Sequence, residues 1–199
     1  MSRLLETVKI KNRQILNLYY HNERMNRSRM EFFGCTEIID LKDIVSVPGY
    51  LTDDVYKCRI IYNPDIELVE FERYNPKKIQ TLKIVECNDI DYSYKFADRS
   101  VFAELQKQRG GCDDILIVKN GFITDTSFSN IVFFDGVKPV TPSTPLLKGT
   151  MRKKLIKNGK ISESDICLKD LQKFQSAKLI NAMLDFEDDT YIKIENISV

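Results

Sequence analysis

Apolar and polar residues alternate in two pairs of short segments near the start of the chain. Residues 3–10 and 14–18 form the first pair, and residues 55–63 and 66–74 form the second. Alternation with a period of two is typical of half-buried β-strands, and the short polar connection inside each pair predicts a hairpin. We therefore expect antiparallel strands in this part of the chain.

One segment between these pairs has a helical period instead. Residues 20–33 place Met25 and Phe33 on an apolar side and Arg24 on a polar side, and Gly34 follows directly. A glycine in this position commonly terminates a helix because it adopts the left-handed conformation without steric cost. The pattern predicts one amphipathic helix that ends at Phe33.

The pattern changes after the polar segment 75–78, where strands and helices begin to mix. The expected elements are strands at 81–86 and 114–119, helices at 97–109 and 149–158, hairpin turns at 120–121 and 135–136, and late strands near 178–183 and 190–197. We therefore predict a small α+β domain at residues 1–78 and a mixed α/β domain at residues 79–199.

Composition argues against several classes of function. Thirty Lys and Arg residues balance 29 Asp and Glu residues to a net charge of +1, so no general field attracts nucleic acid or an anionic membrane. The chain has neither a signal-peptide pattern nor an apolar stretch of membrane length, which predicts a cytoplasmic protein. Five scattered cysteines and the single histidine, His21, favour neither a disulfide framework nor a metal site.

Periodicity does not single out a catalytic residue, but five short segments occur in a distinctive order. They are LETV at 5–8 with YHNERMNRS at 20–28, YKFADR at 94–99, ITDTSFSNI at 123–131, TP at 141–142 with LKGTMR at 147–152, and INAM at 180–183. In this order they resemble the class IV aminotransferase and 4-amino-4-deoxychorismate lyase family across nearly the whole chain. The resemblance implies that family's two-domain fold, with a small N-terminal α+β domain, a barrel-like C-terminal domain and pyridoxal 5'-phosphate (PLP) bound between them, and it implies a homodimer.

The first two segments imply two roles toward the cofactor. Lys95 would be the Schiff-base lysine, whose amine needs a lowered pKa for covalent chemistry. Arg24 would grip the cofactor phosphate, because a guanidinium donates paired hydrogen bonds to phosphate oxygens. Without their neighbours in the sequence, Lys95 would be read as a surface lysine and Arg24 as a solvated cation on a helix.

The third and fourth segments imply the remaining cofactor contacts. Asp125 stands where the family has a glutamate that faces the pyridine nitrogen and keeps the ring protonated, and Asn130 follows among the cofactor-binding residues. Thr150 and Met151 would present their backbone N–H groups to the phosphate from a helix N-terminus. The alternatives are a plain turn residue for Asp125 and a simple helix cap at Gly149-Thr150.

Substrate recognition is where the chain departs from the family. Lys9 occupies the position of a family arginine that recognises substrate carboxylates, and the two side chains are not equivalent at a bidentate site. About twenty residues that usually precede the first matched strand are missing, so part of the substrate wall would be absent or rebuilt. Asn181 and Ala182 belong to a segment closer to that of the lyases than to that of branched-chain transaminases, and Arg99 points the same way.

The resemblance therefore implies an enzyme acting on a small amino substrate. In the favoured reaction, Lys95 removes a proton and the chain converts 4-amino-4-deoxychorismate to 4-aminobenzoate and pyruvate, which feeds folate synthesis. A transaminase acting on branched-chain or D-amino acids would use the same lysine and the same phosphate site. A third possibility is a relative that binds PLP without turnover, and the last is an unrelated α/β domain.

Overall fold

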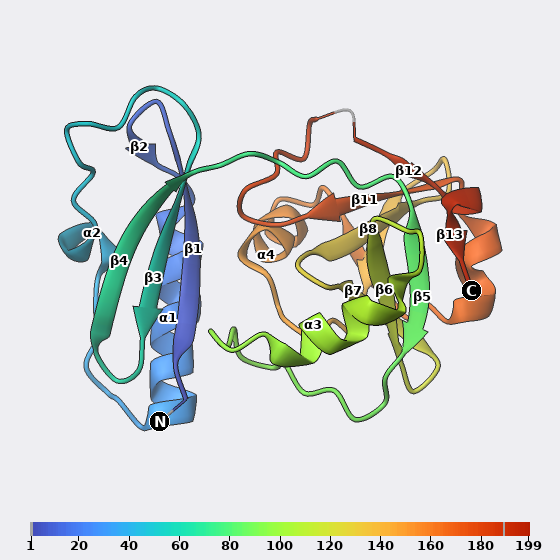
Figure 1. The fold of residues 1–199 in the computed structure, drawn as a ribbon, viewed down its shortest axis with the longest axis horizontal. Coiled ribbons are helices and arrows are strands. Elements are labelled where there is room, and N and C mark those ends of the chain that lie inside the picture. The colour runs from blue at the N-terminus through green and yellow to red at the C-terminus, as the bar shows by residue number, and fades with distance from the viewer. Residues whose placement is uncertain (1, 189) are drawn as a thin grey trace. The chain divides into compact units, whose positions relative to one another are not determined.

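The computed structural model describes residues 2–188 and 190–199, which fold into two compact units (Figure 1). The first unit contains the residues as far as Pro76 together with Tyr94–Asp98, and the second contains Lys77–Ser93 and Arg99–Val199. No helix in the described ranges is long and apolar enough to cross a membrane. Each unit has its own hydrophobic core.

The first unit is built on a four-stranded antiparallel sheet with the order β2-β1-β3-β4. Its strands are β1 (Leu4–Lys11), β2 (Gln14–Ile15), β3 (Tyr56–Tyr62) and β4 (Ile66–Arg73). The two predicted hairpins, β1-β2 and β3-β4, are confirmed, and β1 pairs with β3 from Leu4 to Ile10.

Helix α1 (Leu18–Phe33) packs on one face of this sheet (Figure 1). It begins two residues before the predicted start and ends as predicted, because Gly34 takes a φ of 73° and donates its N–H to the last turn. Met25 of α1 is fully buried in a core cluster with Leu4 and Val8 of β1. A one-turn helix, α2 (Leu41–Ile44), lies in the connection from α1 to β3.

The second unit contains two sheets. A four-stranded sheet has the order β13-β5-β6-β7, and a five-stranded sheet has the order β10-β9-β8-β11-β12. The strands are β5 (Leu82–Glu86), β6 (Asp114–Lys119), β7 (Phe122–Thr126), β8 (Asn130–Phe134), β9 (Pro139–Pro142), β10 (Ser162–Ser164), β11 (Ser176–Ile180), β12 (Ile192–Lys193) and β13 (Ile197–Ser198).

One apolar core joins the two sheets, and it includes Leu116 of β6, Ile131 of β8 and Leu179 of β11. A second cluster joins Val132 and Ile180 of the five-stranded sheet to Met151 and Leu155 of α4. The helices of this unit are α3 (Ser100–Gln106), η1 (Lys107–Arg109), α4 (Thr150–Lys157), η2 (Leu168–Lys173) and η3 (Ile194–Asn196). The chain thus has the mixed α/β fold that the sequence predicts.

Three predicted strands differ from the structure. The strand expected at 14–18 is only Gln14–Ile15, and helix α1 already begins at Leu18. The strand expected near 178–183 ends at Ile180, because the side chain of Asn181 accepts hydrogen bonds from the N–H groups of Met183 and Leu184 and turns the chain. The strand expected at 190–197 is instead two short strands, β12 and β13, which belong to different sheets.

The segment that carries Lys95 belongs to the first unit, although its place in the sequence suggested the second. Its backbone joins the first strand of the chain: Leu5 N–H donates to the carbonyl of Lys95 at 2.8 Å, and Ala97 N–H donates to the carbonyl of Arg3 at 2.9 Å. These long-range bonds replace the first turn of the predicted helix 97–109, which begins only at Ser100.

Candidate active site

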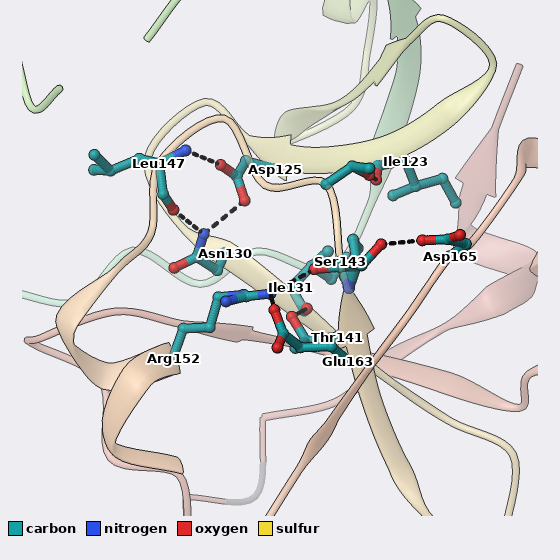
Figure 2. A network of polar contacts seen from close by, with 12 residues as sticks. Ile123, Asp125, Asn130, Ile131, Thr141, Ser143, Leu147, Arg152, Glu163 and Asp165 are labelled. Carbon is teal, nitrogen blue, oxygen red and sulfur yellow. Dashed lines mark hydrogen bonds and ion pairs between the residues drawn. The ribbon is translucent and has the colours of Figure 1, made fainter. Parts of the chain in front are cut away.

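A buried carboxylate marks the site in the second unit. Asp125 lies in β7, is 5% exposed and accepts hydrogen bonds on both oxygens: one from the Asn130 side chain at 2.7 Å and one from Leu147 N–H at 3.0 Å (Figure 2). Burial raises its pKa to about 6, because these hydrogen bonds and the charge of Arg152 only partly offset the loss of solvation. Asp125 is therefore not an exposed turn residue.

Asp125 forms no ion pair with any residue in the described ranges. Buried carboxylates are usually paired with a cation or hydrogen-bonded, since burying a charge without a partner is costly. Asp125 has the hydrogen bonds but no paired cation among the described residues. A positively charged group on a ligand would supply the missing partner.

Helix α4 begins beside this carboxylate. Gly149 precedes the helix in an extended conformation, and no side chain caps the first turn that starts with Thr150 and Met151. Both residues are buried, at 5% and 7% exposure. Backbone N–H groups in the first turn of a helix lack intrahelical acceptors and together favour an anion.

Arg152 fixes this helix to the rest of the unit. Its Nη2 donates to the carbonyl of Pro142 at 2.8 Å. It also donates to the carboxylate of Glu163 at 2.6 Å (Figure 2). The guanidinium is 4% exposed, and its charge lowers the pKa of Asp125. Arg152 is therefore a buried cation that holds α4 and adds positive potential near the carboxylate.

The turn that links β7 and β8 is held by three residues from two other segments, Asn181 after β11 and the segment of α3 with its N-cap Arg99. Asn181 donates to the Ser129 hydroxyl at 2.7 Å, and Gln106 donates to the Ser127 hydroxyl at 2.8 Å. Arg99 donates to the carbonyl of Ser127. Of the residues predicted from the sequence, Asp125, Asn130, Thr150 and Met151 are thus brought together, and Asn181, next to the half-buried Ala182, is tied to their turn.

A second polar cluster lies inside the first unit. Glu6 of β1 is fully buried and accepts two hydrogen bonds from Arg24 of α1, Nε at 2.8 Å and Nη2 at 2.5 Å, and one from His21 Nδ1 at 2.7 Å. Since a carboxylate only accepts, the proton of a neutral His21 is on Nδ1. Arg24 therefore lies on the buried side of α1 and not on the polar side that the helical pattern predicted, because Glu6 neutralises it.

The charges of this cluster are set by its members. Burial alone would raise the pKa of Glu6, but Arg24 and His21 outweigh it and lower the pKa to about 2. Burial lowers the pKa of His21 below its usual value of 6.5, against the effect of Glu6 and with that of Arg24 and Lys95. The cluster is therefore a carboxylate, a guanidinium and a neutral imidazole.

Lys95 is half-buried and belongs to the same unit as this cluster. Its backbone carbonyl accepts a hydrogen bond from the N–H of Leu5, which is next to Glu6 in β1. The positive charge of Lys95 helps to lower the pKa of His21. Lys9, on the opposite side of β1 from Glu6, is also buried, at 3% exposure. The interpretation of Arg24 as a solvated cation does not fit its buried ion pair with Glu6.

Three residues with clear structural roles were not predicted from the sequence. Glu6 lies between the apolar residues Leu4 and Val8 on the inward face of β1. Because a buried acid needs a partner, this position in the sequence could have indicated a buried polar cluster. His21 lies three residues before Arg24 on the same helix face. The role of Arg152 depends on long-range contacts that periodicity does not reveal.

Known proteins resemble this chain in sequence and in structure. The family model for amino-transferase class IV matches residues 93–186. An uncharacterized protein of Haemophilus influenzae is 42% identical over 185 residues, which cover 92% of this chain and 98% of that protein.

Two solved structures extend the comparison. The crystal structure of a "putative 4-amino-4-deoxychorismate lyase" from Haemophilus somnus is 35% identical, with a TM-score of 0.86 and coverage of 92% of this chain and 97% of that one. A hypothetical aminotransferase from Mycobacterium tuberculosis in its PLP-bound form is 16% identical, with a TM-score of 0.76 and coverage of 98% and 81%, and shares the fold. The sequence similarity, the fold and the ordered motifs together establish that this chain belongs to the class IV aminotransferase family of enzymes.

Proposed function

We propose that the chain is a PLP-dependent lyase that converts 4-amino-4-deoxychorismate to 4-aminobenzoate and pyruvate. The observation that carries the cofactor assignment is Asp125, a buried carboxylate without an ion pair in the described ranges. The preference for a lyase comes from the 35% identity to the Haemophilus somnus protein and from the segment Ile180–Met183.

The residues of the second unit fit such a cofactor. A protonated pyridine nitrogen is the kind of cation that Asp125 lacks, and it would hold the carboxylate in its charged form. The uncapped first turn of α4 suits a phosphate group, with N–H donors from Thr150 and Met151. Asp125 and this turn are joined through Leu147, which is two residues before Gly149.

By the family resemblance, Lys95 would attach the cofactor covalently and Arg24 would bind its phosphate. Arg24 is already oriented, because Glu6 accepts from two of the five N–H donors that a guanidinium carries. Orienting a guanidinium in advance reduces the entropy lost when it binds an anion.

The reaction places a different demand on each residue. When bound, PLP would supply an electron-accepting ring. The Lys95 amine would remove the proton from the substrate carbon that carries the amine, and Asp125 would keep the ring nitrogen protonated. Loss of enolpyruvate from the neighbouring carbon would make the substrate ring aromatic, and uptake of a proton by enolpyruvate would give pyruvate.

An assay of products tests this proposal. Protein loaded with PLP should release 4-aminobenzoate and pyruvate in equal amounts from 4-amino-4-deoxychorismate, and these are measured by fluorescence and by coupled lactate dehydrogenase. Transfer of an amino group from a branched-chain or D-amino acid to 2-oxoglutarate, without release of 4-aminobenzoate, would overturn the lyase in favour of a transaminase. PLP binding with neither reaction would leave a cofactor-binding relative without turnover.

The affinity for PLP should depend on pH through Asp125. Its pKa in the folded protein, about 6, exceeds the ordinary 3.8, so its buried charge destabilises the cofactor-free protein as pH rises through that range. A cationic ring nitrogen needs this charge, so affinity should fall by about tenfold per pH unit below the pKa. Equilibrium titrations between pH 5 and 8, followed by cofactor fluorescence, measure the effect.

The near-isosteric variant Asp125→Asn is the matched control. It keeps whatever pH dependence the cofactor itself contributes, but it has no carboxylate to titrate. The difference between the two proteins should therefore change with pH near 6. Parallel profiles for the two proteins would contradict the assignment of Asp125.

Our proposal also includes a cytoplasmic homodimer, in line with the family resemblance. Sedimentation equilibrium of the PLP-loaded protein measures the assembly directly. A monomer with full lyase activity would overturn the dimer without affecting the reaction.

A further inference from the structure

Asn130 joins three parts of the second unit through one side chain. Its Nδ2 group donates to the Asp125 carboxylate at 2.7 Å and to the carbonyl of Leu147 at 2.8 Å. The N–H of Leu147 in turn donates to the other oxygen of Asp125 at 3.0 Å. The result is a closed ring of hydrogen bonds between β7, β8 and the loop before α4 (Figure 2).

The Oδ1 atom of the same amide lies close to Gly149, at the start of α4. A Cβ atom added to Gly149 would lie 2.1 Å from Asn130 Oδ1, whereas the next side chain it meets, Arg152, is 3.9 Å away. The backbone of Gly149, with φ −66° and ψ 150°, is one that any residue adopts. Glycine is therefore required here only because the Asn130 amide occupies the space beside it.

We propose that Asn130 is a positioning residue that holds the Asp125 carboxylate and the N-terminus of α4 at a fixed spacing, with Gly149 as the residue that makes this approach possible. This proposal extends the proposed function, and its statements about cofactor binding rest on that function. A ligand with a cationic nitrogen at one end and a phosphate at the other binds both groups at once only if this spacing is maintained.

The alternative is that Asn130 contacts the cofactor directly, as the family resemblance implies. Both amide hydrogens of Asn130 are already engaged with protein acceptors. The Asn130 side chain is also buried among these partners, at 7% exposure. This geometry favours a residue that acts through Asp125 and α4.

The first test uses the cofactor-free protein and reads Asp125 directly. In Asn130→Ala the pKa of Asp125, measured from its ¹³C-labelled carboxyl by NMR, should rise by about one pH unit because the carboxylate loses a donor. The remaining charged contributor, Arg152, is unchanged. Amide exchange should become at least about tenfold faster at Leu147, whose N–H is bonded to Asp125, and at Lys153, whose N–H is bonded to the carbonyl of Gly149, since the loop before α4 loses its anchor.

Thr124→Val is the matched control for these measurements. It also removes a buried side-chain hydrogen bond from β7, the 2.9 Å bond to the carbonyl of Ile117, but leaves the Asn130 ring intact. The pKa of Asp125 should stay within about 0.3 pH units of the wild-type value in this variant. Equal changes in both variants, or none in Asn130→Ala, would overturn the positioning role.

A double-mutant cycle tests the contact with Gly149. Gly149→Ala alone should weaken PLP binding by about a hundredfold, because the methyl group displaces the Asn130 amide. In the Asn130→Ala background the obstructing atoms are gone, and the same substitution should change affinity by less than about threefold. Equal costs in both backgrounds would show that Gly149 is needed for another reason.

Separate probes for the two ends of the cofactor complete the test. At about pH 8, where Asp125 is charged in both proteins, Asn130→Ala should lower affinity for PLP by about a hundredfold, while affinities for pyridoxal and for inorganic phosphate change by less than about threefold each. A loss confined to pyridoxal would assign Asn130 to ring contact and overturn the proposal. If wild-type protein binds no PLP, the proposed function fails, and the NMR and exchange measurements still decide the role of Asn130.

Discussion

Replacing Lys95 with alanine should abolish covalent retention of PLP and lower turnover by at least about 10³-fold, since one amine serves both as the attachment point and as the base. After borohydride treatment, wild-type protein should carry the reduced cofactor on the peptide containing Lys95, as identified by mass spectrometry. The variant should carry none. Non-covalent binding should survive in part, because Arg24, Asp125 and α4 remain.

Lys107→Ala is the control for this experiment. Lys107 is exposed and paired with Glu104 on the surface, so its loss should leave both the labelling and the turnover unchanged. Labelling of Lys95→Ala at another lysine, with turnover preserved, would show that the family motif identifies the wrong residue. Folding of the variant is checked by its unfolding curve in urea.

Local signals predicted most of the regular elements. The two N-terminal hairpins, the end of α1 at Gly34 and the turn at Asn120-Gly121 all depend on neighbouring residues in the chain. Periodicity gave no information about the parallel pairs β5-β6 and β9-β10, because each pair joins segments separated by long stretches of chain. The pairing of Lys95 with β1 was hidden for the same reason.

The candidate residues came from motif resemblance, and their surroundings came from the structure. No spacing rule places Leu147 N–H on Asp125, or Glu6 between His21 and Arg24. The helical pattern placed Arg24 on the wrong face of α1 for a simple physical reason. A helical pattern assumes that charged residues point to water, whereas a charged residue can point inward when a strand presents a buried partner.

Glu6→Ala should destabilise the protein by about 3–5 kcal/mol, because it leaves the buried guanidinium of Arg24 without its countercharge. The free energy of unfolding in urea measures the loss. The surface variant Glu70→Ala removes a carboxylate from an exposed pair with Arg59 in the same sheet and should cost less than about 1 kcal/mol. A similar cost for both variants would contradict a special role for the buried cluster.

The pH dependence of this stability separates charge from packing. The pKa of Glu6 is about 2 in the folded protein against 4.5 ordinarily, so its contribution is complete above about pH 4.5 and is lost as pH falls toward 2. His21 adds a loss in the same direction below pH 6.5, because its lowered pKa means that the unfolded chain takes up the proton first. In Glu6→Ala the acid-dependent loss of stability between pH 4.5 and 2 should be smaller than in wild type.

The double variant Glu6→Leu/Arg24→Leu should lose less stability than the sum of its single substitutions by about 1–3 kcal/mol, since neither charge is then left buried alone.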